Sequence, residues 1–413
     1  MGAGVGPRRS MPFSQFNPLT LYRVGIDGHR LAGPHGGDAA YAHTVAEVLS
    51  LAGHEVMGIF GLDVGSRPEL REVLFFDRFR RVDRPTGWGA LGRHAQALRP
   101  RSAIELHDVP LTARVEKRAL ARHLPPFGRI VSGAGLFETA ATRFRLLQRL
   151  TSIRIDHPPD IMHWTAPVPL WLEGACNIYS LPDRASFESP WVAACIRHAD
   201  YVCAVSSSNR DEILARFAAV AGKIGVAHRV PLLPADVVQG DPATDARMIE
   251  GAFGLKRRGY LLGAGTDRFL HSLAGACHVA NSDMPLVMIG ASRGMVDHDE
   301  GVRWLEPLPR HLLLALMRGA RAIVSESEGR VAHEAMLLGT PVLRGVGESS
   351  AEGPCPVEAG DTRMIARWLQ RLGQDDSLCA ELTRQGAGRA AKFSAGRYHD
   401  QLMAIYDKAM GVS

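Results

Sequence analysis

The stretch from residue 322 to residue 343, AIVSESEGRVAHEAMLLGTPVL, constrains the fold more than any other part of the chain. It opens with a short apolar run of the kind that forms a buried parallel strand. A polar loop ending in Gly329 follows, and the segment from Val331 to Leu338 is typical of a helix. Gly339 stands where helices end, and Pro341 prevents continuation. The stretch therefore predicts a strand, a helix and a second parallel strand.

Two carboxylates bracket this unit. Glu326 lies in the loop and Glu334 lies in the helix, eight positions further on. Ligands of open α/β sheets bind at the carboxyl ends of the strands. The start of a helix suits a phosphate, because its N–H groups and its dipole favour negative charge. Carboxylates accept hydrogen bonds from sugar hydroxyls, so the arrangement predicts a nucleotide-sugar site. The alternative is an ordinary strand–helix unit with solvated glutamates.

The stretch resembles the E-x7-E signature of retaining GT-B glycosyltransferases of the GT4 type. That family reads roughly S-E-G-F-G-L-x-x-L-E-A-M-x-x-G-x-P-V, and Glu328 stands where the family carries an aromatic residue. The positions that this chain keeps are Ser325, Glu326, Gly329, Glu334, Ala335, Met336, Gly339, Pro341 and Val342. The resemblance implies an α/β chain of the GT-B fold, with two Rossmann-like doubly wound domains facing a cleft. It also implies a C-terminal helix that crosses back to the first domain.

The length of 413 residues independently favours two domains. Residues 228–245 are rich in proline and aspartate, and the apolar periodicity lapses there. We therefore place the domain boundary in this region. The predicted parts are a disordered lead over 1–20, an acceptor-binding domain over 21–235, a nucleotide-sugar-binding domain over 236–393, and a terminal helix over 394–413 that packs on the first domain.

Charge and cysteine usage bear on location. The chain has 48 Lys and Arg against 43 Asp and Glu, and many arginines fall between residues 67 and 122. Such a stretch can face anionic lipid headgroups, although a solvated helix face is the simpler interpretation. No nucleic-acid recognition motif accompanies the charge. The six cysteines have no zinc-binding spacing, and the start of the chain lacks the apolar core of a secretory signal. We expect a cytoplasmic protein, peripheral at the inner membrane face.

The amino-terminal part opens as a strand–helix–strand unit. A strand over 22–27 precedes a glycine-rich loop over 28–38, a helix over 41–52 and a strand over 56–60. The loop has no G-x-G-x-x-G dinucleotide fingerprint. Gly36 and Gly37 still allow close approach of the backbone to a ligand, as the family resemblance implies for this loop. The alternative is a plain turn. Further short strands are predicted over 73–76 and 102–106.

A second departure from the family concerns the strand over 175–181. The family carries a His-Asp pair after it, in which the histidine helps to hold the donor sugar. This chain has Pro182 and Asp183 instead. A proline side chain forms no hydrogen bond, so His163, at the end of the strand over 160–163, is a candidate for the role. The alternative is that His163 is a structural residue.

The carboxyl-terminal part carries the other predicted contacts. Gly265 and Thr266 form a turn after the strand over 260–263, and Arg268 falls where the family carries a diphosphate-binding lysine. Arginine grips phosphate well, although a residue at a helix start can also be a plain surface side chain. The predicted catalytic residues are Glu326, Arg268, Asp183 and His163. The predicted nucleotide-sugar-binding residues are Gly36, Gly37, Gly265, Thr266, Gly290, Leu305, Gly329 and Glu334. In this scheme Glu326 contacts the donor sugar and Glu334 the ribose hydroxyls.

The resemblance implies transfer of a hexose, with retention, from a nucleoside diphosphate sugar to a glycan or lipid-linked acceptor in polysaccharide or glycoconjugate synthesis. GDP-mannose and UDP-sugars are the candidate donors, and the start of the chain, which is similar to mannosyltransferases, favours the first. No metal-binding motif is evident, so no metal or other cofactor is expected. Two alternatives stay open. One is a non-catalytic homologue that binds a nucleotide sugar or glycan as a scaffold, and the other is a nucleotide-sugar epimerase.

Overall fold

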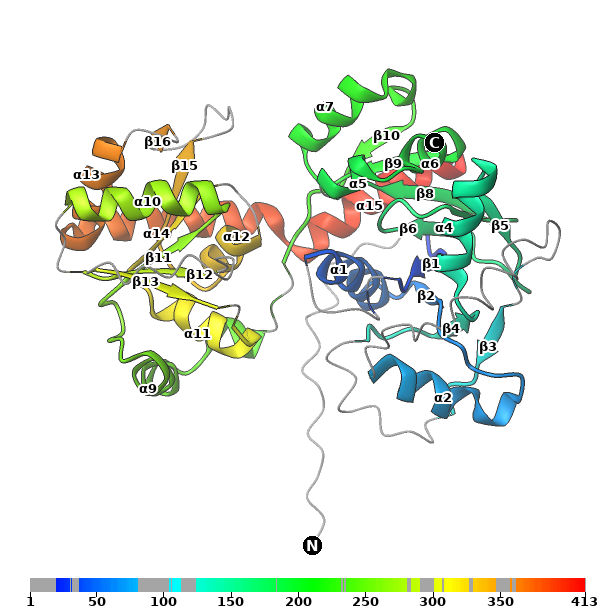
Figure 1. The fold of residues 1–413 in the computed structure, drawn as a ribbon, viewed down its shortest axis with the longest axis horizontal. Helices are drawn as coiled ribbons and strands as arrows, with labels where there is room; N and C mark the ends of the chain where they lie inside the picture. The colour runs from blue at the N-terminus through cyan, green and yellow to red at the C-terminus, as the bar shows by residue number, and fades with distance from the viewer. Residues whose placement is uncertain are drawn as a thin grey trace, which may run out of the picture. The chain divides into compact units, whose positions relative to one another are not determined.

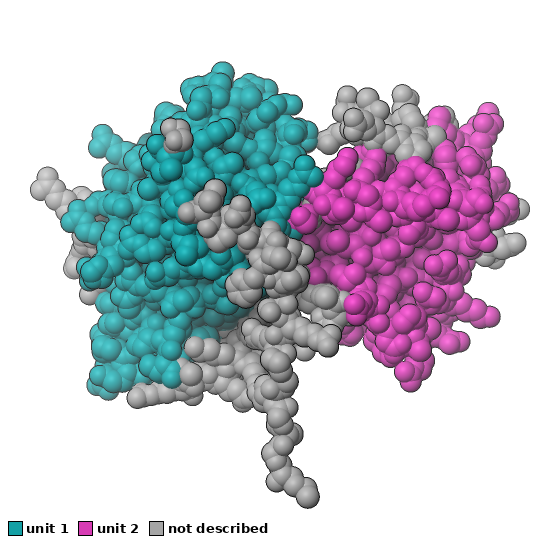
Figure 2. All heavy atoms as spheres, turned by 180° about the vertical axis from the view of Figure 1, so that it is seen from behind, with its two compact units in different colours: residues 1–229, 395–413 teal, residues 230–394 magenta. Residues whose placement is uncertain are grey.

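The chain forms two compact units, which Figure 2 shows in different colours. Unit 1 comprises residues 1–229 and 395–413, and unit 2 comprises residues 230–394. The computed structural model describes residues 20–29, 31, 37–80, 104, 106–112, 124–182, 184–231, 233, 235–280, 284–289, 301–306, 308–326, 330–346, 357–358 and 362–412. The predicted lead up to residue 19 and most of the arginine-rich stretch lie outside these residues. Among the described helices, none combines the length and the apolar composition that crossing a bilayer requires.

Unit 1 is built on an eight-stranded sheet in the order β10-β9-β8-β6-β1-β2-β4-β3 (Figure 1). Its described strands pair in parallel, except that β3 runs antiparallel to β4. The strands are β1 (Arg23–Asp27), β2 (Glu55–Phe60), β3 (His107–Val109), β4 (Arg129–Ser132), β6 (Ile161–Trp164), β8 (Cys176–Ser180), β9 (Tyr201–Ala204) and β10 (Ile224–Val226). A separate parallel pair consists of β5 (Thr151–Ile153) and β7 (Leu170–Leu172). The central strands are buried almost throughout, as expected for parallel strands covered on both faces.

The helices of unit 1 that the structure describes are α1 (Gly37–Leu51), α2 (Pro68–Arg80), α4 (Leu136–Leu147), α5 (Arg184–Glu188), α6 (Val192–His198), α7 (Ser207–Arg216), the 3-10 turn η3 (Ala218–Val220) and α15 (Ala395–Met410). The predicted strand over 73–76 is wrong, because these residues belong to α2. Phe75 and Phe79, four positions apart, lie on one helix face with ring centroids 5.9 Å apart, and both pack against Phe60 of β2. The predicted strand over 102–106 lies mostly outside the described residues.

The terminal helix α15 packs on unit 1, against α1 and the strands β8, β9 and β10. Its buried face includes Tyr398, Leu402, Ile405 and Tyr406, which recur at helical spacing. Gly225 of β10 allows this close approach, because a Cβ at that position would lie 2.6 Å from Ile405.

A pair of buried histidines also ties α15 to the sheet. The backbone N–H of Tyr22 donates to Nδ1 of His54 at 3.1 Å, and Nε2 of His54 lies 3.0 Å from Nε2 of His399 on α15. Nδ1 of His54 is therefore an acceptor, so its Nε2 carries the proton and donates to His399. Both imidazoles are neutral in this arrangement. Burial lowers the pKa of His54 to about 4 and also lowers the pKa of His399.

Unit 2 is built on a six-stranded sheet in the order β13-β12-β11-β14-β15-β16, and all neighbouring strands pair in parallel. The strands are β11 (Leu261–Ala264), β12 (Leu286–Ile289), β13 (Val302–Leu305), β14 (Ala322–Ser325), β15 (Val342–Val346) and β16 (Val357–Glu358). The described helices are α8 (Ala235–Gln239), α9 (Pro242–Phe253), α10 (Asp267–Ala280), α11 (Arg310–Gly319), α12 (Arg330–Leu337), α13 (Thr362–Gln374), α14 (Asp376–Ala390) and the 3-10 turn η4 (Ala391–Phe393). Two hydrophobic clusters cover the sheet. One includes residues of α10 and α13, and the other includes residues of α9, α11 and α12.

The turn after α12 explains the G-T-P-V sequence. Gly339 has φ +73, a left-handed conformation that favours glycine. Its N–H donates to the carbonyl of Met336 at 3.1 Å, and the N–H of Thr340 donates to the carbonyl of Ala335 at 2.9 Å. These two bonds form a Schellman motif, which satisfies carbonyls that the helix end would otherwise leave unpaired. The predicted helix end is therefore confirmed.

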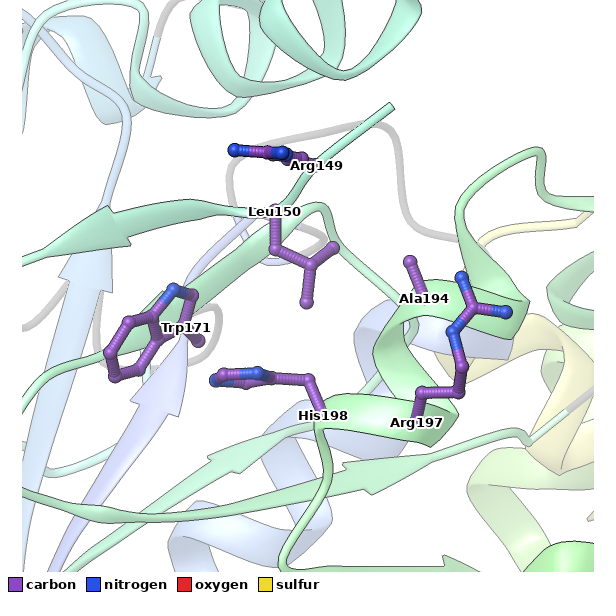
Figure 3. A pocket seen from close by; sticks show the side chains of 6 residues that line it. All are labelled: Arg149, Leu150, Trp171, Ala194, Arg197 and His198. Carbon is purple, nitrogen blue, oxygen red and sulfur yellow. The ribbon is translucent and has the colours of Figure 1, made fainter. Parts of the chain in front are cut away.

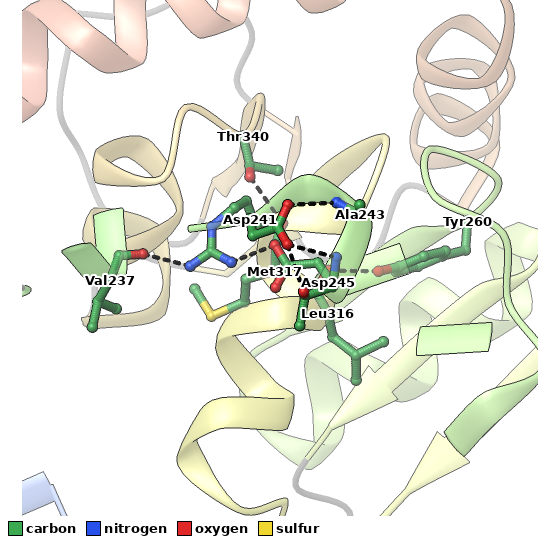
Figure 4. Close-up of polar contacts among 10 residues, drawn as sticks. Val237, Asp241, Ala243, Asp245, Tyr260, Leu316, Met317 and Thr340 are labelled. Atoms are coloured by element: carbon green, nitrogen blue, oxygen red, sulfur yellow. Dashed lines mark hydrogen bonds and ion pairs between the residues drawn. The ribbon is translucent and has the colours of Figure 1, made fainter. Parts of the chain in front are cut away.

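Helix α11 is fixed at its carboxyl end by side chains from three other segments of unit 2 (Figure 4). The Tyr260 hydroxyl donates to the Leu316 carbonyl at 2.6 Å, and the Thr340 hydroxyl donates to the Met317 carbonyl at 2.8 Å. Arg318 forms a buried ion pair with Asp245 of α9. Because α11 is held in this way, the position of its amino-terminal end relative to the sheet is also fixed.

Candidate functional site

The site is built at the carboxyl edge of the unit 2 sheet. Since the strands are parallel, the ends of β11, β13 and β14 and the starts of α10, α11 and α12 meet at this edge. Glu326 directly follows β14, and its Oε2 accepts from the backbone N–H of Thr266 at 2.6 Å. Its Oε1 accepts from the Thr266 hydroxyl at 3.0 Å. The sequence-predicted residues Thr266 and Glu326 are thus brought into contact, 60 positions apart in the chain.

Gly265 is required by this contact. A Cβ at Gly265 would lie 2.6 Å from Cδ1 of Phe269 and 2.9 Å from Oε2 of Glu326. A larger residue would therefore push the Glu326 carboxylate away from the start of α10. The backbone at Gly265 and Thr266 is exposed, so a ligand can reach it.

Other predicted residues of this unit lie at the same edge. Arg268 is an exposed residue in the first turn of α10. Leu305 is the last residue of β13 and is half-buried. Gly290 and Gly329 lie outside the described residues.

Glu334 is held by two arginines that the sequence analysis did not select. Its carboxylate is 1% exposed and accepts a two-pronged contact from Arg310, Nη1 to Oε2 at 2.6 Å and Nη2 to Oε1 at 2.7 Å. Nε of Arg330 lies 3.2 Å from Oε1 of the same carboxylate. The four-residue spacing of Arg330 and Glu334 on one helix was visible in the sequence. The contact with Arg310, 24 positions away, depends on the fold bringing α11 and α12 to one hydrophobic cluster.

His163 occupies a different setting from the one predicted. It is fully buried in unit 1, with Nδ1 2.8 Å from the Tyr406 hydroxyl and Nε2 2.8 Å from the Ser180 hydroxyl. Burial lowers its pKa to about 3, so the imidazole is neutral at pH 7. Both ring nitrogens are engaged within the core, an arrangement that fits the alternative assignment of His163 as a structural residue.

The other positions that the sequence analysis considered in unit 1 lie next to β8 and at the start of α1. Pro182 follows β8 and is half-buried, and Asp183 lies outside the described residues. Gly37 is the first residue of α1, whereas Gly36 also lies outside the described part of the chain.

Unit 1 carries an open hollow of about 340 Å³ that no sequence prediction addressed (Figure 3). The rings of Trp171 and His198 lie at one side with centroids 4.5 Å apart. Its lining residues are Arg149, Leu150, Trp171, Ala194, Arg197 and His198. The hollow combines apolar and aromatic surface with two exposed arginines.

Two Rossmann-like units, with a terminal helix that returns to the first, define the GT-B fold. Solved structures of glycosyltransferases share it. A glycosyltransferase of Rickettsia africae superimposes with a TM-score of 0.55 at 12% identity, covering 96% of this chain and 100% of that one. HepE of Anabaena, solved with UDP and glucose, gives 0.55 at 14% identity, with 94% and 100% covered. WaaG, a glycosyltransferase involved in lipopolysaccharide biosynthesis, gives 0.51 at 13%, again with 94% and 100% covered.

These similarities concern the fold. The sequence matches no family model, and no curated protein is detectably similar to it.

Proposed function

We propose that the chain is a retaining glycosyltransferase of the GT4 type that transfers a hexose from a nucleoside diphosphate sugar. The observation that carries the proposal is the contact between Glu326 and Thr266. It fixes a carboxylate at the joint ends of β11 and β14, beside an exposed glycine-containing turn that opens α10. A sugar diphosphate requires both features, namely an acceptor for sugar hydroxyls and N–H donors at a helix start.

In the proposed donor complex, the diphosphate lies against the turn at Gly265 and the start of α10. Arg268 contributes positive charge there. Negative charge builds on the diphosphate as the glycosidic bond breaks, and donors fixed in advance stabilise that charge without reorganising. Glu326 orients the donor sugar. We propose that the reaction proceeds without a metal ion.

The proposed reaction retains the configuration at the anomeric carbon. The acceptor hydroxyl attacks from the face that the diphosphate leaves, and a phosphate oxygen of the leaving group takes its proton. No protein nucleophile is needed in this scheme. Unit 1 binds the acceptor, which we propose to be a glycan or a lipid-linked saccharide. A lipid-linked acceptor agrees with peripheral membrane contact by a cytoplasmic protein.

The donor candidates are GDP-mannose and UDP-sugars. The resemblance of the first residues to mannosyltransferases favours GDP-mannose. The presence of UDP and glucose in the structure of HepE favours a UDP-sugar. Calorimetry with UDP-glucose, GDP-mannose, UDP-N-acetylglucosamine, UDP and GDP distinguishes them.

A second candidate is a non-catalytic homologue that binds a nucleotide sugar as part of an assembly. Two observations favour it, namely Pro182 in place of a hydrogen-bonding histidine and the burial of His163 away from solvent. Slow hydrolysis of one nucleotide sugar in the absence of acceptor would support the transferase. Binding of that nucleotide sugar with no turnover would support the second candidate.

Replacing Glu326 with glutamine is expected to lower kcat/KM for donor turnover by about 10–100-fold, because a charged contact worth roughly 1–3 kcal/mol is lost. The assay is release of nucleoside diphosphate from the donor that calorimetry selects. Glu250→Gln, which changes an exposed glutamate on α9, is the matched control and should leave the rate unchanged. Equal rates for Glu326→Gln and the wild type would show that the Glu326 carboxylate does not contact the donor.

A further inference from the structure

Three helices at the carboxyl edge of the unit 2 sheet each carry an arginine in their first turn. These are Arg268 on α10, Arg310 on α11 and Arg330 on α12. A cation at a helix start is unfavourable, because the helix dipole is positive there. Neither α11 nor α12 has an acidic residue in its first turn to offset this charge. Three helices thus each bring an arginine to the edge where parallel sheets bind ligands.

The arrangement of Glu334 shows how two of these arginines are held. Arg310 and Arg330 are 42% and 35% exposed, whereas the carboxylate beneath them is 1% exposed. The arginines therefore form the solvent-facing layer, and Glu334 forms its support. The carboxylate accepts three contacts from the two guanidinium groups, which leaves little capacity for ribose hydroxyls.

The cluster of Glu334, Arg310 and Arg330 carries a net charge of +1. Arg310 directs two of its five N–H groups at Glu334, so three remain for other acceptors. Guanidinium groups bind phosphate oxygens in pairs of charge-assisted hydrogen bonds. An anionic group with several oxygens, placed over the cluster, would offset both the arginine charge and the dipoles of α11 and α12.

From this geometry we infer that Arg310 and Arg330 bind the diphosphate of the donor, and that Glu334 is a positioning residue for them. The inference rests on the proposed function, since it takes the ligand to be a nucleoside diphosphate sugar. The family resemblance implies that Glu334 contacts the ribose directly. The inference gives Glu334 a different role, which is to position the two arginines. It also supplies the cations that Arg268 alone does not provide.

The experiment compares binding of a nucleoside diphosphate with binding of the matching nucleoside by calorimetry. UDP with uridine and GDP with guanosine are titrated into the wild type, Arg310→Gln, Arg330→Gln and Glu334→Gln. We expect each variant to weaken diphosphate binding by about 10–30-fold, as for a lost charge-assisted contact. Nucleoside binding should change by less than about twofold. Arg257→Gln, at an exposed arginine before β11, is the matched control and should bind both ligands as the wild type does.

Two results would overturn the inference while leaving the proposed function intact. If Glu334→Gln weakens nucleoside and diphosphate equally, Glu334 contacts the ribose directly. If both arginine variants bind the diphosphate as the wild type does, the arginines serve only to neutralise Glu334. Failure of the wild type to bind any nucleotide would instead overturn the proposed function.

Loss of one partner can leave a buried charge unpaired, so a variant can fail to fold. The double variant Arg310→Gln/Glu334→Gln removes one charge of each sign and avoids this. Thermal unfolding establishes that it is folded, and weakened diphosphate binding with normal nucleoside binding would support the inference. Arg310→Lys keeps the charge but loses the two-pronged geometry, and we expect it to bind the diphosphate between the wild type and Arg310→Gln.

Discussion

Lowering the pH from 7 to 4.5 is expected to remove about 4–5 kcal/mol from the free energy of unfolding of unit 1. His163 contributes one half and His54 the other. Burial lowers the pKa of His163 to about 3 and that of His54 to about 4. Both groups are neutral in the folded protein over this range, whereas an unfolded histidine has an ordinary pKa near 6.5. A loss of this size is a large part of the stability of a typical domain.

The sign of the effect follows from proton binding. Between pH 6.5 and the lowered pKa, the unfolded chain binds more protons than the folded chain, so stability falls as the pH falls. The part of the free energy of unfolding that depends on these neutral imidazoles is fully present above pH 6.5. As the pH falls, it is lost progressively toward pH 4 for His54 and toward pH 3 for His163. Most carboxylates titrate below pH 4.5, so the interval from 6.5 to 4.5 reports mainly on histidines.

Urea unfolding at a series of pH values, followed by near-ultraviolet circular dichroism, measures this dependence. Replacing His399 with glutamine should flatten the curve, since His54 then lacks its imidazole partner on α15. A free energy of unfolding that stays constant between pH 7 and 4.5 would contradict the burial of these imidazoles.

Replacing Asp245 with alanine is expected to destabilise unit 2 by about 3–5 kcal/mol, the usual cost of leaving one member of a buried ion pair without its partner. The side chains of Asp245 and Arg318 are only 6% and 11% exposed. Arg318 also donates to the Val237 carbonyl, so its charge would stay in the interior after the substitution. Urea unfolding of the full chain measures the change.

Two further variants give this prediction its controls. Glu250→Ala, an exposed change on the same helix, should cost less than about 0.5 kcal/mol. The double replacement Asp245→Leu/Arg318→Met should recover much of the loss, because a buried ion pair can often be exchanged for apolar residues of similar size. A cost below about 1 kcal/mol for Asp245→Ala would show that Arg318 reaches solvent when its partner is absent.

The sequence predicted those parts of the fold whose signals are local. The apolar run of β14, the Gly339 turn and the hydroxyl of Ser206, which accepts from the Asn209 N–H at 3.0 Å to cap α7, all act within a few residues. The strand predicted over 73–76 failed because a four-residue apolar run fits a strand and a helix equally well. Helix α14 was missed since Gly386 and Gly388 interrupt its apolar pattern. Gly386 packs closely on Met336 there.

Side-chain partners separated widely in the chain were beyond the sequence. The motif identified Glu326 and Glu334, but not that Thr266 and Arg310 are their partners. Each contact depends on which strands and helices are neighbours. The same holds for His163, whose Nδ1 has its partner in the hydroxyl of Tyr406, 243 positions away in the chain.

Because unit 1 is completed by α15, its two segments are separated by the whole of unit 2. During synthesis on the ribosome, residues 230–394 emerge as a continuous segment and can form their own core first. Unit 1 is complete only once α15 has emerged, since Tyr406 and His399 supply the partners of His163 and His54. A nascent chain that stalls before residue 395 would display the apolar surface around Gly225 to chaperones.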